Sequence, residues 1–166
     1  MNEKEAGTER EKATIVVFSG ELDRALAAFN IATTAASMGM EVTMFFTFWG
    51  LNVIVREKGS GGEKKALQRM MGLMNRGGAR RLSLSRLNML GAGKAAMKKL
   101  MREYRMPSLE EMIPMAKELG VRFIACTTSM ALMGLKESDF IPEVDDFAGA
   151  ATYVEKAASS KINLFI

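Results

Sequence analysis

Short runs of β-branched and aromatic residues alternate with amphipathic stretches along this chain, and this alternation restricts the fold more than any other feature. The runs at 13–18 (ATIVVF), 41–47 (EVTMFFT) and 121–125 (VRFIA) are mostly apolar. Runs of this kind are typical of strands buried on both faces of a parallel sheet. Residues with helical periodicity follow these strands, as in βαβ units. We therefore predict a three-layer α/β domain with a parallel sheet of about five strands.

The remaining elements follow from local patterns. We expect two further strands at 82–85 and 161–166, and helices at 63–75, 93–105 and 109–119. Asp145 or Asp146 is expected to cap a last helix. The buried face of that helix is predicted to contain Phe147, Ala150, Val154 and Ala157. Residues 1–12 alternate in charge and are expected to form a disordered arm, which leaves 13–166 as a single domain.

Two residue counts exclude several classes of active site. The chain has no histidine, so it cannot hold a Ser-His-Asp triad, a Cys-His dyad or a histidine-ligated metal by itself. A single cysteine excludes an internal disulfide and fits a reducing compartment. The first twelve residues lack the apolar core of a secretory signal, and the longest apolar run, 42–55, is too short to span a bilayer. We expect a cytoplasmic protein without a metal or another cofactor.

Positive charge is concentrated in the middle of the chain. Residues 56–105 contain 14 Lys and Arg against 3 Asp and Glu, whereas the whole chain has a net charge of only +4. The stretch 93–105 is amphipathic, and its basic face carries Lys94, Lys98, Lys99, Arg102 and Arg105. Such a face is usually only solvated. Alternatively, it docks an acidic protein or makes a peripheral contact with an anionic membrane. We expect no nucleic-acid partner.

The only cysteine, Cys126, follows the strand predicted at 121–125 and precedes a helix that ends near Gly134. A thiol at this position lies near the unpaired N–H groups of a helix N-terminus, which stabilise an anion and lower a thiol pKa. Cys126 is therefore a candidate nucleophile. The alternative is structural, because free cysteine is often buried as a small apolar side chain.

Ligands of open α/β sheets bind outside the carboxyl ends of the strands. Three predicted strand ends meet there, and they supply hydroxyl groups, glycines and two aromatic rings but no evident general acid or base. Trp49 can exclude water there, while hydroxyl and N–H groups can hold an anion such as a thiolate. The candidate binding residues beside Cys126 are Ser19, Gly20, Thr47, Phe48, Trp49, Gly50, Asn52, Thr127, Thr128 and Ser129.

Three segments together resemble one protein family. They are FFTFWGLN (45–52), GLMNRGGARRLSLSRLNMLG (72–91) and LGVRFIACTTSMALMGL (119–135). The chain is similar from Thr14 to Ile166 to the DsrE/DsrF/DrsH-like proteins, and most similar to the branch encoded near TusA-like sulfur carriers and rhodaneses. The cysteine segment is the most specific part. The resemblance implies a flavodoxin-like fold, a homo-oligomer, expected here to be a trimer, and a cysteine that carries sulfane sulfur as a persulfide.

Cys126 matches the family's cysteine by position, so the resemblance implies that it accepts sulfur from one carrier thiol and passes it to another. A TusA-like sulfur carrier or a rhodanese is the expected partner. This exchange requires a thiolate and an accessible sulfur but no histidine. A second hypothesis comes from a different class of protein. In it, Cys126 is inert, and the chain is a non-catalytic oligomeric adaptor that binds through its basic middle region.

Overall fold

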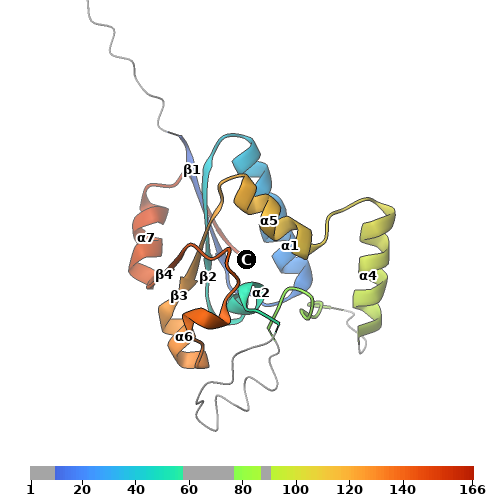
Figure 1. Cartoon of the computed structure of the whole chain (residues 1–166). Coiled ribbons are helices and arrows are strands. Elements are labelled where there is room, and N and C mark those ends of the chain that lie inside the picture. Colours follow the sequence, from blue (N-terminus) through green and yellow to red (C-terminus); the bar gives the residue numbers. More distant parts are fainter. Residues whose placement is uncertain (1–9, 58–76, 87–90) are drawn as a thin grey trace, which may run out of the picture.

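Within residues 10–57, 77–86 and 91–166, which the computed structural model describes, five parallel strands form one sheet (Figure 1). The predicted fold class is confirmed. The order across the sheet is β4-β3-β2-β1-β5. The helix predicted at 63–75 and most of the arm at 1–12 lie outside the described residues. The strands are β1 (Lys12–Val17), β2 (Glu41–Phe46), β3 (Arg122–Cys126), β4 (Asp146–Ala148) and β5 (Ile162–Phe165).

Helices cover both faces of the sheet, because the strand side chains are apolar on both. α1 and α5 pack together on one face, and α7 lies on the other (Figure 1). Short elements at the carboxyl ends of β2 and β3 complete the layers. The elements are α1 (Leu22–Ser37), η1 (Phe48–Gly50), α2 (Leu51–Ile54), α4 (Ala92–Glu103), α5 (Leu109–Glu118), α6 (Thr127–Met133), η3 (Glu137–Asp139) and α7 (Ala150–Ala158).

The main core lies between the sheet and the α1–α5 layer. Phe29 of α1 contacts Phe46 of β2 and Phe123 of β3, with ring centroids 6.2 and 5.6 Å apart, and all three rings are fully buried. A smaller cluster on the opposite face contains Phe45, Ile124 and Cys126. Because successive side chains of a strand point to opposite faces, Cys126 lies on the α7 face of the sheet.

The prediction of a strand at 82–85 is wrong. This segment makes only a single bridge, between Ser83 and Glu21, and runs beside the start of α1. Its backbone is held there because the Leu22 N–H donates to the Ser83 carbonyl at 2.7 Å. The Ser85 N–H also donates to Asp23 at 3.0 Å. Leu82 and Leu84 are buried in the main core. Their burial explains why apolar and polar residues alternate here, although the segment is not a strand of the sheet.

The prediction around Asp145 and Asp146 is also wrong, because residues 146–148 form strand β4 and the last helix begins at Ala150. Asp145 does not cap that helix. Its carboxylate accepts hydrogen bonds from the Phe123 N–H at 2.7 Å and from Lys117 at 2.5 Å. These contacts hold the start of β4 against β3. Val154, predicted to be buried, is 60% exposed.

The basic stretch folds as α4, which stands at one side of the molecule (Figure 1). Its Met101 is buried, whereas Lys99 and Arg102 are exposed. Lys98 pairs with Glu110 of α5 at 3.6 Å, so this part of the basic face is a structural contact. Among the described residues, none of the helices has the length and apolar character needed to cross a bilayer.

Candidate functional site

Cys126 is the last residue of β3 and the residue immediately before α6. This confirms its predicted place at the carboxyl end of a strand and at the start of a helix. The side chain packs with Phe45, Ile124 and the partly buried Tyr153 of α7, and Cys126 as a whole is 4% exposed. The neighbouring Thr127 and Thr128 are exposed. The thiol therefore lies just below the surface, with an apolar wall on its sheet side.

Polar groups from two elements meet at this sulfur. The hydroxyl groups of Thr47, which follows β2, and Ser129 of α6 are 2.8 Å apart, and Ser129 is 2% exposed. Burial raises the pKa of the Cys126 thiol. Hydrogen bonds from the Ser129 N–H, the Ser129 and Thr47 hydroxyls and the Thr128 N–H lower it more, so the pKa of Cys126 lies below its ordinary value. The arrangement therefore favours a thiolate.

The pairing of Thr47 with Ser129 follows from the order of the sheet. β2 is the direct neighbour of β3, so the residue after β2 lies beside the first turn of α6. Of the predicted binding residues, Thr47, Thr128 and Ser129 therefore act on the sulfur. Thr127 lies next to Cys126 in sequence, and its side chain is exposed.

Ser19, Gly20 and Asn52 form a second group, because β1 is separated from β3 by β2. Two strand spacings are about 10 Å. The Ser19 hydroxyl donates to Glu21 at 2.9 Å. Asn52 is 6% exposed and lies close to Gly20. The group also contacts other segments: the Gly78 N–H donates to the Asn52 carbonyl at 2.8 Å, and the Ser19 N–H donates to the Ile166 carbonyl at 3.3 Å.

Gly50 is required where these turns cross. Its N–H donates to the Phe18 carbonyl at 2.7 Å, and a Cβ atom at this position would lie 1.9 Å from the Val17 carbonyl oxygen.

We expect Gly50→Ala to lower the free energy of unfolding by about 3 kcal/mol, because the backbone itself must move. Gly149→Ala is the matched control, since its Cβ would meet nothing within 4 Å. The control should cost about 1 kcal/mol or less, as expected for a helix N-cap. Equal denaturant midpoints for the two variants would contradict this assignment.

Phe48 and Trp49 border the site but do not enclose it. Their exposed fractions are 42% and 41%, and η1, which contains both, packs against α6. Phe48 has a φ of 46°, a left-handed conformation that is rare for a bulky residue. Sequence reasoning missed three aromatic neighbours on this face, Phe18, Phe165 and Tyr153. Their positions depend on β5 lying next to β1 and on α7 covering β2, and local sequence carries no signal for either.

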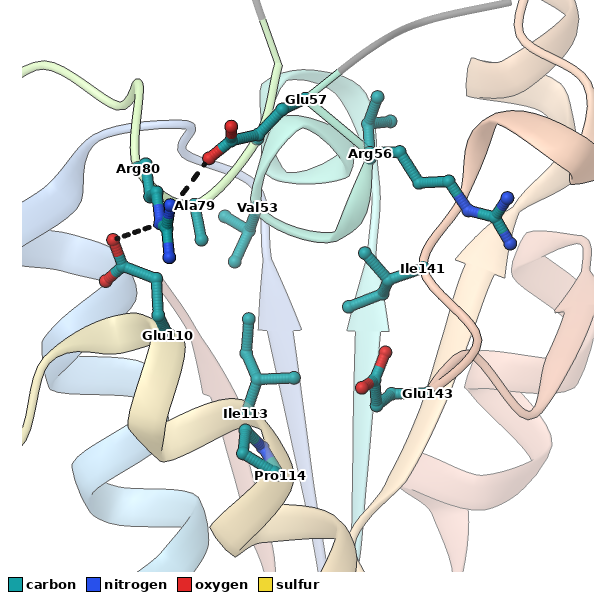
Figure 2. A pocket seen from close by; sticks show the side chains of 12 residues that line it. Val53, Arg56, Glu57, Ala79, Arg80, Glu110, Ile113, Pro114, Ile141 and Glu143 are labelled. Carbon is teal, nitrogen blue, oxygen red and sulfur yellow. Dashed lines mark ion pairs between the residues drawn. The ribbon is translucent and has the colours of Figure 1, made fainter.

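A separate cavity of about 250 Å³ lies on the α5 side of the sheet (Figure 2). Val53 and Ile113 contribute to its apolar wall, and Arg80 lies at its edge between Glu57 and Glu110, 3.7 Å from each carboxylate. None of the predicted site residues lines it. Within the described part of the chain, His, Cys, Asp and Glu side chains form no group of three suited to a metal ion.

Two curated proteins align with almost the whole chain. The uncharacterized protein YrkE of Bacillus subtilis is 40% identical over 156 residues, which cover 94% of this chain and 97% of that protein. The sulfur carrier protein DsrE2 of Allochromatium vinosum is 34% identical over 167 residues, which cover 95% of this chain and 99% of that protein.

Solved structures with similar folds include the ychN protein of E. coli. Its TM-score is 0.56 at 10% identity, and the match covers 95% of this chain and all of that one. Protein MTH1491 of Methanobacterium thermoautotrophicum has a TM-score of 0.51 at 13% identity, with 94% and 99% coverage. These likenesses support the α/β fold. The model of the DsrE/DsrF/DrsH-like family matches residues 9–165, and with the two relatives this shows that the chain belongs to the DsrE/DsrF/DrsH-like family.

Proposed function

We propose that this protein is a sulfur carrier that holds sulfane sulfur as a persulfide on Cys126 and passes it between thiols of other carriers. Membership of the family and the likeness to a protein named as a sulfur carrier support a role in sulfur transfer. The single observation that carries the proposal is the group of donors around Cys126, because it favours the thiolate that sulfur exchange requires.

The proposed reaction is an exchange of sulfur between thiols. The Cys126 thiolate attacks the outer sulfur of a donor persulfide, R–S–SH. The bond between the two donor sulfurs breaks, R–S⁻ leaves, and Cys126 becomes Cys–S–SH. An acceptor thiolate then attacks the outer sulfur of this new persulfide and releases the Cys126 thiolate. The two steps are equivalent in form, so no external oxidant or reductant is consumed. The hydroxyl groups of Thr47 and Ser129 stabilise the thiolate in both directions.

The alternative of an inert structural cysteine predicts different reactivity. A thiol that only fills space has its pKa raised by burial, whereas the contacts of Cys126 lower its pKa. Under the proposal, the protein takes up sulfur from glutathione persulfide and, after removal of the donor, releases it as sulfide on addition of dithiothreitol. Failure to release sulfide from protein that has been exposed to the donor and desalted would contradict a carrier role.

We further propose that the chain assembles as a homotrimer. Several large apolar side chains are exposed on the layer opposite to Cys126, which is unfavourable for an isolated chain. They are Leu100 of α4, Met115 of α5, and Met38 and Leu119, which directly follow α1 and α5. Phe45 and Phe46 are buried inside the subunit and do not contribute to this surface. Light scattering at micromolar concentration should give the mass of a trimer. A monomer mass at that concentration would refute this assembly.

A further inference from the structure

A row of four aromatic side chains, three of them exposed and one half-buried, runs along the carboxyl edge of the sheet on the Cys126 face. Phe18 lies between Phe48 and Phe165, with ring centroids 5.4 and 5.5 Å away. Phe48 is 42% exposed and Phe165 is 70% exposed. Trp49, 41% exposed, follows Phe48 in η1. We call these four residues the aromatic row. They come from three separate parts of the chain and gather only in the folded protein.

The aromatic row and Cys126 share one face of the sheet. Val16 of β1 is paired with Phe45 on one side and with Phe165 on the other. Phe45 lies in the same cluster as Cys126, so the α7 face of the sheet is continuous from the cysteine to Phe165. β3 and β5 are three strand spacings apart, or about 14 Å. The row therefore extends directly away from the sulfur.

The shape and size of the row fit a protein better than a small molecule or a permanent partner. Its rings stand at the surface, so a small persulfide would gain little enclosure from them. The three most exposed rings present about 300 Å² of apolar surface, if each aromatic side chain has roughly 200 Å² in total. A stable interface needs about 800 Å² from each partner, whereas short-lived redox complexes use less. A permanent contact with a second copy would also obstruct the approach to Cys126.

We propose that the aromatic row is the docking surface for a carrier protein whose persulfide is surrounded by apolar residues, and that this docking brings the donor sulfur to Cys126. The inference rests on the proposed function. The unusual backbone of Phe48 fits this role, because a φ of 46° is unfavourable for phenylalanine yet holds the ring beside Phe18. The hydroxyl of Thr47, the residue before Phe48, contacts the hydroxyl of Ser129, so the proposed docking surface and the reacting cysteine are linked through one turn.

The test compares two sulfur donors, glutathione persulfide and a rhodanese charged with thiosulfate. Intact-mass measurements follow the loading rate of wild type and of Phe165→Ser. We expect the variant to load at least tenfold more slowly from the rhodanese and within twofold of wild type from glutathione persulfide. Val154→Ser is the matched control, because Val154 is a 60% exposed residue of α7 outside the row, and it should load normally from both donors. An equal loss with both donors, or no loss with either, would overturn the docking proposal.

A binding measurement separates docking from chemistry. Trp49 is the only tryptophan, so 5-fluorotryptophan labelling gives a single ¹⁹F resonance from the row. Adding uncharged rhodanese should shift this resonance in wild type and leave it in place in Phe165→Ser. If wild type loads from neither donor but the shift occurs, the proposed function fails and the docking surface stands. No shift in wild type, or a resonance that already depends on the concentration of this protein alone, would overturn the docking proposal.

Discussion

Replacing Cys126 with serine is expected to abolish persulfide loading and to leave the fold intact. The two side chains are close in size, and the cysteine is surrounded both by apolar groups and by the hydroxyls of Thr47 and Ser129, which can receive a serine hydroxyl. Serine cannot carry a persulfide and is not ionised at neutral pH. Methionine cannot replace it as a carrier either, and Cys126 is the only cysteine in the chain. The loss of loading should therefore be complete.

The measurement for Cys126→Ser combines intact mass with thermal unfolding. The variant should gain no sulfur from glutathione persulfide, and its unfolding midpoint should stay within a few degrees of wild type. Thr127→Ser is a suitable control, because it changes an exposed neighbour and keeps the cysteine. A Cys126→Ser protein that still gains sulfur would refute the assignment of the carrier residue. If it does not fold, Cys126→Ala allows the same comparison.

Removing the Ser129 hydroxyl should slow the reaction of Cys126 most strongly near neutral pH. Burial raises the pKa of this thiol, and the donors from Ser129, Thr47 and Thr128 lower it below the ordinary value. Ser129→Ala keeps the Ser129 N–H but loses one hydroxyl donor, so the pKa of Cys126 must rise and less thiolate is present at pH 7. A hydrogen bond to a charged group contributes roughly 1.5 kcal/mol, which predicts about a tenfold slower alkylation at pH 7.

The direction of the pH dependence checks this explanation. At a pH well above the pKa of both proteins, each thiol is fully ionised, and the rates of wild type and Ser129→Ala should converge. Thr128→Ala is the matched control, because Thr128 acts through its backbone N–H and its side chain is exposed. Its alkylation profile should overlie that of wild type. A Ser129→Ala profile that is lowered equally at every pH would show that the hydroxyl controls access to the sulfur instead of its ionisation.

Much of the fold could be predicted because its strong signals are local. β1, β2 and β3 are mostly apolar runs, and each was recognisable in the sequence. β4 was not recognisable, because its three residues, Asp146–Ala148, are too few to show the alternation of apolar and polar side chains typical of a strand. The segment 82–85 had a strand-like alternation, yet its backbone is engaged by Leu22 and Asp23 at the start of α1. These contacts join residues that are far apart in the sequence, so the local sequence pattern could not reveal them.

The candidate site could be predicted as far as it depends on the positions of the strand ends, but not where it depends on strand order. Strand ends of a parallel sheet meet at one edge, so the nearness of Thr47 and Ser129 to Cys126 followed from recognising the strands. Their 2.8 Å contact required that β2 and β3 be direct neighbours. Ser19 was grouped with them in the sequence, but β2 separates its strand from β3. Strand order also determines that Phe165 stands beside Phe18, and it is the property that the sequence pattern leaves open.

The most direct test of the central claim is the mass of the Cys126 peptide after the intact protein has been incubated with glutathione persulfide. The persulfide is trapped with an alkylating reagent before digestion, so that its position is preserved. The sulfur-carrier account predicts that the peptide containing Cys126 gains one sulfur atom, and that a brief treatment with dithiothreitol before trapping removes it. A peptide that stays unmodified under donor excess, while the donor still loads a control thiol, would contradict the account.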